Sequence, residues 1–248
     1  MDDGLQGLWL KTEKMIKKIV PPGTKEKLHG LNLMRLSRKY RTQRGYDAEK
    51  YWNDLHVKYG ADIRAVGRHR DEDKDMELYA NSEEIFVKLC SRTGIDFKKC
   101  RVLEIGCGSG YWTSVVAGLG CPDYLGGDIS DFAIKKARKE FPKYNFECLD
   151  VTEQEIQGQY DVIMMIDVTQ HITDRDKFVY AMENVRHALK KDGHFIVTSY
   201  LKDRPEQYNF YCVPWHLEDY QIVFSEDAYA FAIEDGFNEK QIMVIERC

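Results

Sequence analysis

The sequence predicts an α/β protein with a doubly wound, mostly parallel sheet that carries helices on both of its faces. Three observations support this fold. Short apolar runs alternate with amphipathic segments from about residue 82 onward. A glycine-rich turn at 106–110 follows the first run, and the second run ends on an acid, Asp128. Folds of this kind bind ligands at the carboxyl ends of their parallel strands.

The individual elements follow from the spacing of apolar residues. Ser82 is the expected N-cap of a helix, Asp47 is the expected N-cap of an earlier one, and the charged run 68–75 is expected to be a solvated loop. We expect strands near 101–105, 123–127, 145–148, 160–166, 193–199 and 241–246. We expect helices near 82–93, 110–118, 130–140, 175–189 and 225–235.

Composition sets further limits. The chain has 248 residues, of which 43% are hydrophobic and 31% are charged, as in soluble globular proteins. No apolar run is long enough to cross a membrane and no signal-peptide pattern opens the sequence, so we expect a cytoplasmic protein. The seven cysteines are scattered without a Cys-x-x-Cys pair, which predicts reduced thiols and neither a disulfide framework nor a metal site.

Charge is distributed unevenly along the chain. Residues 1–44 hold eleven Lys or Arg against four Asp or Glu, a net charge of +7, which leaves −12 for the other 204 residues. In the same segment Leu5, Leu8 and Trp9 begin an apolar stripe at helical spacing. The sequence therefore predicts three parts: a basic amphipathic helical arm at 1–44, a helical lid segment at 45–81, and a ligand-binding domain at 82–248.

The partner of the arm is left open between three interpretations. The helices of the arm can dock on the domain with their basic face in solvent. They can instead lie on an anionic membrane surface, with Trp9 at the headgroup level, which would place the protein at the inner face of the membrane. Nucleic-acid binding is the least favoured interpretation because the rest of the chain is acidic, and we expect no nucleic-acid partner. No pattern indicates the oligomeric state.

The glycine turn carries most of the chemical information. Its pattern is Glu104-x-Gly106-Cys107-Gly108-x-Gly110. Glycine allows a positive φ and a close approach of the backbone to a ligand, and the following helix offers free N–H groups. A dinucleotide turn has a different spacing, and an acid in the loop is unfavourable beside a pyrophosphate but suits a cationic ligand. The small size of Cys107 is the simplest reason for its place in the loop.

This pattern resembles motif I of the class I, Rossmann-like S-adenosylmethionine-dependent methyltransferases. The resemblance continues in the order of that family over roughly residues 80–248. Asp128, with the adjacent Ile129, falls at the acid that binds the ribose, and Asp150, with Val151, falls at the acid that meets the adenine amino group.

Three further segments extend the resemblance. Residues 160–168, which include Asp167, resemble the fourth strand; residues 170–172 resemble the turn after it; and residues 189–197 resemble the entry to the fifth strand. The resemblance implies that S-adenosylmethionine is the cofactor. The cofactor contacts that it implies are Glu104, Gly106, Cys107, Gly108, Gly110, Asp128, Ile129, Asp150, Val151 and Asp167.

A helix ahead of the core often covers the cofactor in this family. By that resemblance Tyr51 and Trp52 cover the pocket; the alternative is that these aromatic side chains anchor the helix to the core. No His and Cys cluster has metal-ligand spacing.

An oxygen nucleophile needs a base during methyl transfer. His171, directly after the fourth strand, is the first candidate, and His216 is the second. Each histidine has a structural alternative, since a histidine in such a loop often holds it by a hydrogen bond. The aromatic segment around Tyr208, Tyr211 and Trp215 is expected to line the acceptor pocket or, alternatively, to form a structural lid.

These observations predict an enzyme that methylates a hydroxyl group. Residues 19–25 resemble a segment of surface-glycan transferases and methyltransferases, so the expected acceptor is a sugar of a surface glycan or of its lipid-linked precursor. Residues 167–170 lack the Asn/Asp-Pro-Pro-aromatic motif of methyltransferases that act on the amino groups of bases. Two alternatives stay open: O- or N-methylation of a soluble small molecule, and a catalytically silent scaffold that binds S-adenosylmethionine.

Overall fold

The structure, a computed structural model, describes residues 32–201, 209–238 and 240–248. The chain divides into two compact units, Met1–Arg41 and Thr42–Cys248. Residues 32–40 of the first unit are helical, and strand β1 (Arg41–Thr42) follows them. The predictions for residues 1–31 of the basic arm lie outside the described residues.

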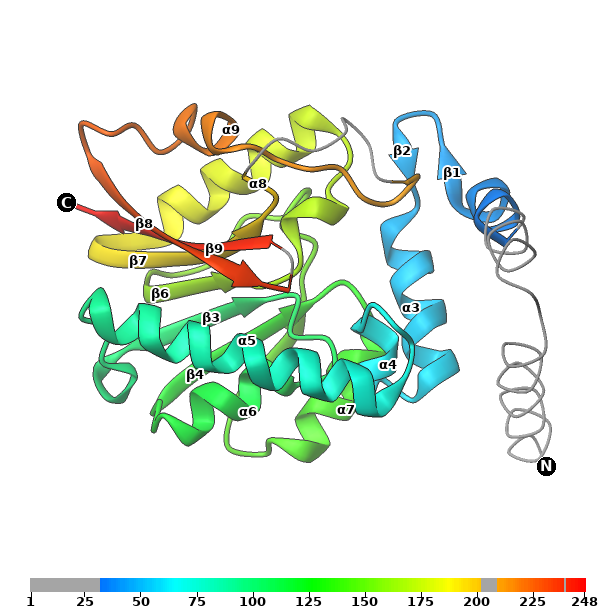
Figure 1. The fold of residues 1–248 in the computed structure, drawn as a ribbon, viewed down its shortest axis with the longest axis horizontal. Coiled ribbons are helices and arrows are strands. Elements are labelled where there is room, and N and C mark those ends of the chain that lie inside the picture. Colours follow the sequence, from blue (N-terminus) through cyan, green and yellow to red (C-terminus); the bar gives the residue numbers. More distant parts are fainter. Residues whose placement is uncertain (1–31, 202–208, 239) are drawn as a thin grey trace. The chain divides into compact units, whose positions relative to one another are not determined.

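Most strands of the second unit belong to one sheet (Figure 1). In the described residues, this sheet has seven strands in the order β5-β4-β3-β6-β7-β9-β8. Strand β9 runs antiparallel to its neighbours β7 and β8. The strands are β3 (Arg101–Ile105), β4 (Asp123–Asp128), β5 (Asn145–Cys148), β6 (Tyr160–Met165), β7 (Leu189–Ser199), β8 (Tyr229–Phe237) and β9 (Lys240–Arg247); β2 (Gly45–Tyr46) lies outside the sheet.

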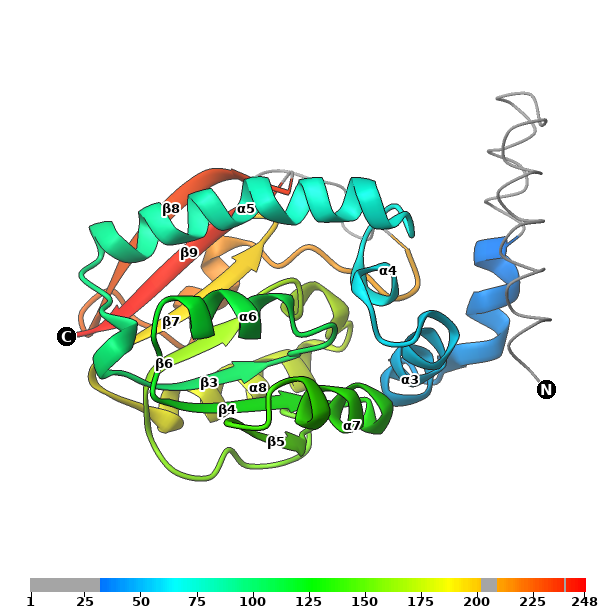
Figure 2. The ribbon, with the colours of Figure 1, turned by 90° about the horizontal axis from the view of Figure 1, so that it is seen from below.

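Helices cover both faces of the sheet (Figures 1 and 2). One apolar core packs α5, α6 and α7 against the strands, and a second core packs α8 and α9 against the opposite face. Side chains of β3 alternate between the cores: Val102 belongs to the first, and Leu103 and Ile105 to the second. The helices are α3 (Ala48–Tyr59), α4 (Ile63–Val66), α5 (Glu72–Arg92), α6 (Tyr111–Gly118), α7 (Asp131–Glu140), α8 (Arg175–Ala188) and α9 (Leu217–Gln221), with short 3₁₀ turns at η1 (Phe97–Lys99) and η2 (Thr169–His171).

The register of the parallel strands brings their carboxyl ends to one edge. Ile105 at the end of β3 pairs with Gly127 of β4, and Glu104 pairs with Met164 of β6. The predicted α/β fold is therefore confirmed, together with the six predicted strands. The turns that follow β3, β4 and β6 meet at this edge of the sheet.

The prediction of a helix at 225–235 is wrong, because most of this segment belongs to strand β8. β8 pairs with β9 along its length, from Tyr229 opposite Arg247 to Phe237 opposite Lys240. Phe237 is buried and stacks on Trp112 at a centroid distance of 5.6 Å. Pairing with a neighbouring strand outweighs the helix propensity of the Ala and Glu residues in this segment.

The start of α5 also differs from the prediction. The helix begins at Glu72, with Asp71 as its N-cap, so part of the expected loop at 68–75 is helical. Ser82 is not a cap but a buried residue inside the helix, where its hydroxyl donates to the Leu78 carbonyl at 2.9 Å. Buried Asp75 accepts hydrogen bonds from the backbone N–H groups of His69 and Asp71, which holds the turn before the helix.

Helix α3 is held over the sheet edge by polar contacts. It begins as predicted at Asp47, whose carboxylate accepts from the backbone N–H of Lys50 at 3.0 Å. Farther along, the Asn53 side-chain oxygen accepts from the Ser130 hydroxyl at 2.9 Å and from the Phe132 N–H at 3.3 Å. These bonds tie the middle of α3 to the turn between β4 and α7.

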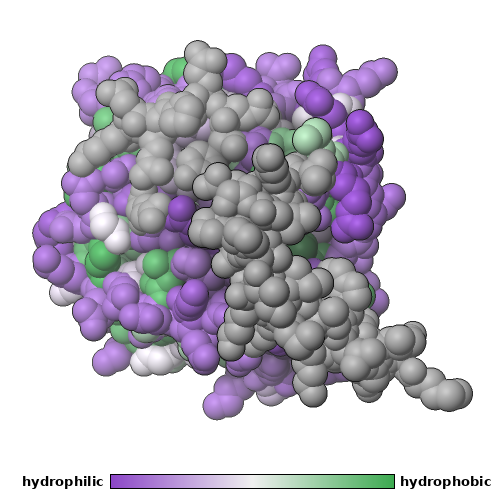
Figure 3. Space-filling model, turned by 45° about the vertical axis from the view of Figure 1, so that its right-hand side comes forward, coloured by the Kyte–Doolittle hydropathy of each residue, from purple (hydrophilic) through white to green (hydrophobic). Residues whose placement is uncertain are grey.

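The described residues on the face drawn in Figure 3 are mostly hydrophilic. In the view of Figure 3 apolar side chains form small separate patches among hydrophilic ones. Across 32–201, 209–238 and 240–248, none of the helices has the length and apolar character that a membrane crossing requires.

Candidate active site

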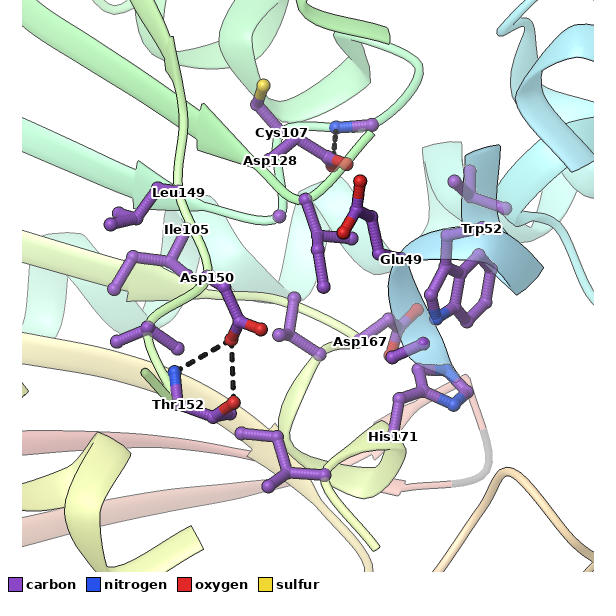
Figure 4. A pocket seen from close by; sticks show the side chains of 18 of the residues that line it. Glu49, Trp52, Ile105, Cys107, Asp128, Leu149, Asp150, Thr152, Asp167 and His171 are labelled. Carbon is purple, nitrogen blue, oxygen red and sulfur yellow. Dashed lines mark hydrogen bonds between the residues drawn. The ribbon is translucent and has the colours of Figure 1, made fainter. Parts of the chain in front are cut away.

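A cavity of about 410 Å³ lies at the carboxyl ends of β3, β4 and β6, and α3 contributes to its wall. Pockets for small ligands usually have this size or somewhat more. Figure 4 shows carboxylates from four segments around one central space, with Trp52 and His171 bordering it on one side. These acids are Glu49, Asp128, Asp150 and Asp167, and such a cavity favours a cationic ligand.

The glycine turn forms one wall of the cavity. Gly106, Gly108 and Gly110 have φ values of 81°, 46° and 83°. A Cβ on Gly106 would lie 2.3 Å from a Val168 methyl group, and a Cβ on Gly108 would lie 3.0 Å from a Val66 methyl group. Glycine is therefore required here both for the backbone conformation and for the space. Gly106, Cys107 and Gly108 line the cavity, whereas Gly110 is the N-cap of α6.

Asp128 connects this turn to the end of β4. One carboxylate oxygen accepts from the Gly108 N–H at 2.9 Å, and the other accepts from the Ser130 N–H at 2.8 Å. The residue is buried and lines the cavity with Ile129. Each oxygen keeps a lone pair that can accept a hydrogen bond from a ligand.

Asp150 lies after β5 on another side of the cavity, and Val151 also lines it. One oxygen of Asp150 accepts from the N–H of Thr152 at 2.9 Å and from its hydroxyl at 2.6 Å (Figure 4). This short turn fixes the carboxylate with its other oxygen available to a ligand.

Asp167 follows β6 and has a positive φ of 61°. Its carboxylate forms a buried ion pair with Lys240 of β9 and accepts from the Thr198 hydroxyl at 3.2 Å. Burial alone would raise the pKa of Asp167, but the Lys240 ammonium outweighs it, and the pKa lies below its usual value. Asp167 is therefore a carboxylate at neutral pH.

Glu104 does not line the cavity. Its carboxyl group lies between β3, β4 and α6, where it accepts from the Thr113 hydroxyl at 3.1 Å and forms a short hydrogen bond with the Tyr124 hydroxyl. Burial raises the pKa of Glu104 to about 7, although these two hydrogen bonds oppose the change. Glu104 thus stabilises the base of the glycine turn from inside the core.

Cys107 contributes a small buried side chain to the turn. Burial raises the pKa of its thiol well above the usual value, and the nearby carboxylates of Asp128 and Glu104 act in the same direction. A thiol in this state is a weak nucleophile.

His171 lines the cavity at the end of the 3₁₀ turn η2. Its Nδ1 lies 2.8 Å from the Tyr211 carbonyl, which accepts only if Nδ1 carries the proton. Burial lowers the pKa of His171 to about 4. At neutral pH the ring is therefore uncharged, and Nε2 carries a lone pair.

Three side chains of α3 at helical spacing, Glu49, Trp52 and His56, line the cavity. The Trp52 ring lies 4.7 Å from the His171 ring, and its N–H donates to the Tyr46 hydroxyl at 3.1 Å. The Tyr46 hydroxyl in turn donates to the backbone carbonyl of His171 at 3.1 Å.

Tyr51 points away from the cavity. It is buried and stacks on Tyr211 at a centroid distance of 5.0 Å. Of the two aromatic residues expected to cover the cofactor, only Trp52 is among the residues that line the cavity.

The aromatic segment after β7 has mixed roles. Trp215 is buried, stacks on Phe178 at 4.0 Å, and donates its N–H to the Thr169 carbonyl at 3.0 Å. His216 is the N-cap of α9, where its backbone N–H donates to the Asp219 carboxylate at 3.0 Å. Tyr211, Trp215 and His216 are not among the cavity residues, and Tyr208 lies outside the described residues.

Two residues that the sequence did not single out belong to this region. Lys240 comes from the last strand, and no local motif indicated that it would reach Asp167. His56 had a usable signal: it lies four residues after Trp52 and so on the same face of α3. Among the described residues, no group of three or more His, Cys, Asp or Glu side chains is arranged to hold a metal ion.

Comparison with known proteins agrees with this geometry. The family described as "Methyltransferase domain" matches residues 103–195. A ubiquinone biosynthesis O-methyltransferase from Bordetella avium is 30% identical over 116 residues, which are 44% of this chain and 46% of that protein. A ribosomal protein L11 methyltransferase from Acetivibrio thermocellus is 23% identical over 193 residues, which are 71% and 58% of the two chains.

The fold has solved relatives. The crystal structure of a magnesium protoporphyrin IX methyltransferase from Synechocystis PCC 6803 with bound S-adenosylmethionine superposes with a TM-score of 0.62 at 16% identity, over 84% of this chain and 100% of that chain. The chain spans less than two thirds of the length of the curated relatives it matches first. Residues 103–195 thus match the methyltransferase-domain family, and the chain shares its fold with a solved S-adenosylmethionine-bound methyltransferase.

Proposed function

We propose that the protein transfers the methyl group of S-adenosylmethionine to a hydroxyl group of a polar acceptor. The observation that carries this proposal is the meeting of the glycine turn, three strand-end acids and the neutral His171 around one cavity. The relatives support methyl transfer but act on different acceptors, since their names include a quinone pathway, a ribosomal protein and a porphyrin.

The residues of the cavity fit the cofactor. S-adenosylmethionine carries a sulfonium, an ammonium, a ribose diol and an adenine amine, and it supplies a methyl group on an already activated leaving group. The glycine turn brings backbone to the cavity wall, where Gly106, Cys107 and Gly108 line it. We propose that Asp128 accepts from the ribose, Asp150 from the adenine amine, and Asp167 from the ammonium. By this proposal Glu104 and Gly110 support the turn without touching the ligand.

His171 is proposed to receive the proton of the acceptor hydroxyl. The Tyr211 carbonyl holds the proton of the ring on Nδ1, so Nε2 is the acceptor nitrogen; it also lies 3.4 Å from the Gln170 side-chain amide nitrogen. The hydrogen bonds from Trp52 to Tyr46 and from Tyr46 to the His171 carbonyl fix the position of the turn. The low pKa gives only a small driving force for proton transfer, so orientation of the hydroxyl is the larger contribution.

The charged residues that line the cavity suit a hydrophilic acceptor. Exposed charged residues of both signs line the cavity, and Lys177 pairs with Glu153 at 2.7 Å. A sugar matches this polar wall better than an apolar ring system does. Together with the resemblance of residues 19–25, this supports a sugar of a surface glycan or of a lipid-linked precursor as acceptor. The other members of this wall include Arg44, Asp47, Glu49 and Asp174.

A soluble small molecule is the second candidate acceptor, because the same polar wall accepts it without any role for the basic arm. The alternative to an enzyme is a scaffold protein that binds the cofactor without transferring its methyl group. We also propose that the arm at 1–44 touches an anionic membrane and that segment 45–81 works as a lid.

One experiment separates these functions. The full chain is incubated with methyl-labelled S-adenosylmethionine and a cell extract of the source organism, and the label is partitioned between lipid and aqueous phases. Label in lipid or high-mass glycan supports the glycan proposal, and label in a small soluble compound supports the second candidate. Binding of the cofactor without release of S-adenosylhomocysteine would support the scaffold alternative.

A further inference from the structure

His56 of helix α3 has a buried side chain with an unsatisfied polar atom. The residue is only 1% exposed, and its Nδ1 has no hydrogen-bond partner among the residues that the structure describes. Leaving a buried polar atom unpaired costs about 1–3 kcal/mol. His56 also lines the cavity, so a ligand bound there can supply a partner to the ring.

Packing on the glycine turn and the hydrogen bonds of Asn53 determine where this ring lies. Its Cε1 is 3.7 Å from the position that a Cβ on Gly108 would take, so the ring covers the glycine turn. Asn53, three residues earlier on α3, bonds to the Ser130 hydroxyl, and Ser130 also donates its N–H to Asp128. Helix α3 therefore holds His56 over the two segments that Asp128 joins.

The charge state of the ring suits a hydroxyl ligand. Burial lowers the pKa of His56, and the opposite effect of Asp128, the largest charge acting on the ring, does not reverse it. A neutral imidazole has one N–H donor and one acceptor nitrogen. Asp128 can only accept, because both of its oxygens already accept a backbone N–H. Two adjacent hydroxyl groups need donors as well as acceptors, and His56 beside Asp128 supplies both.

We propose that His56 hydrogen-bonds the ribose diol of the cofactor together with Asp128, so that helix α3 takes part in recognising the sugar of S-adenosylmethionine. This inference rests on the proposed function, because it concerns the same cavity. It makes His56 a specificity-determining residue and couples the position of α3 to the presence of both ribose hydroxyls.

Calorimetry with S-adenosylhomocysteine and its 2′-deoxy and 3′-deoxy analogues tests the proposal on the full chain. His56→Phe keeps the ring size but removes both nitrogens, and His187→Phe makes the same change at an exposed position on α8. We expect His56→Phe to lose about tenfold in affinity for S-adenosylhomocysteine. We expect that loss to disappear for one of the two deoxy analogues, while His187→Phe binds all three as the wild type does.

Two further variants keep the test meaningful if His56→Phe does not fold. An Asn amide reaches the position of Nδ1, whereas a Gln amide reaches that of Nε2. His56→Asn should bind S-adenosylhomocysteine within about threefold of the wild type, and His56→Gln should lose about tenfold. Equal affinities for the two variants would overturn the proposal.

The outcomes also separate this inference from the proposed function. A wild-type chain that does not bind S-adenosylhomocysteine contradicts the proposed function itself. A wild-type chain that binds it, with His56→Phe losing the same factor for all three ligands or nothing for any of them, contradicts only the role of His56.

Discussion

The backbone N–H of Gly108 donates to a carboxylate oxygen of Asp128 at 2.9 Å, so the acid at the end of β4 holds the turn after β3. The second oxygen of Asp128 accepts from the Ser130 N–H at 2.8 Å, which fixes the start of α7. One buried carboxylate thus orders both segments of the cavity wall before a ligand binds. Such preorganisation lowers the cost of binding, because these groups are already in place.

Asp128→Asn should weaken the binding of S-adenosylhomocysteine by roughly 1.5–3 kcal/mol, the range for hydrogen bonds to a charged group. The amide keeps the shape of the side chain but loses the charge, and its NH₂ group faces a backbone N–H. Isothermal titration calorimetry measures the effect. Asp131→Asn is the matched control, since it removes an exposed carboxylate three residues later on α7. Unchanged affinity in Asp128→Asn would refute the ribose assignment.

His171→Asn separates a base from a residue that only holds its loop. The Asn amide can still donate to the Tyr211 carbonyl, as Nδ1 does, but it lacks the lone pair of Nε2. If His171 takes the proton, kcat should fall by about 10²–10⁴ while the affinity for S-adenosylhomocysteine stays unchanged. Retention of wild-type kcat would assign His171 a purely structural role.

The same residue sets an expectation for the pH dependence of the wild-type enzyme. Burial lowers the pKa of His171 to about 4, so the unprotonated ring is the main form throughout pH 5.5–8. The rate should show no loss on acidification near pH 6.5, the usual value for histidine, and should fall only as the pH approaches 4. An inflection at 6.5 that is absent from His171→Asn would contradict the low pKa.

The sequence predicted the parts of the site that depend on local pattern. The glycine turn, Asp128 and Asp150 each follow a strand directly, and the structure places them around one cavity. Lys240 lies on β9 and His56 on α3, and both elements are distant in sequence from the glycine turn. Their contacts in this region therefore depend on tertiary packing. Strand β8 could not be predicted for a related reason: its hydrogen bonds come from β9, whereas its own residues favour a helix.

Glu104 also illustrates the difference between a motif and a contact. The acid of the motif was expected at the ligand, but the alternation of β3 turns it toward the core shared with α6, where Thr113 donates to it. A pattern in the sequence gives the position of this acid on the strand. Which face of the strand is covered, and by what, depends on helix packing.

Glu104→Gln should change the dependence of folding stability on pH. The pKa of Glu104 is raised to about 7 in the folded protein, whereas it is near 4.5 in the unfolded chain. The stability that the neutral carboxyl group contributes is therefore complete below pH 4.5 and is lost as the pH rises through 7. The variant is neutral at every pH and should gain about 1–3 kcal/mol over the wild type between pH 5 and 8. Chemical unfolding at several pH values measures this difference. Parallel stability curves for the two proteins would contradict the raised pKa.

Lys240→Met should destabilise the fold, because it leaves the Asp167 carboxylate buried without its partner. Breaking one side of a buried pair costs about 3–5 kcal/mol, and adding Asp167→Asn should recover most of that loss. The ion pair lowers the pKa of Asp167 in the folded protein. The stability that the pair contributes is therefore present above the pKa of the unfolded chain and is lost as the pH falls through the pKa of the folded protein. In Lys240→Met, burial without the ammonium should raise the pKa of Asp167, so its carboxyl group takes up a proton on acidification and the penalty falls. The deficit of Lys240→Met in urea unfolding should therefore be larger at pH 7 than at pH 4. A deficit that does not change with pH, or a double variant no more stable than Lys240→Met, would show that the ion pair does not determine the stability of this strand end.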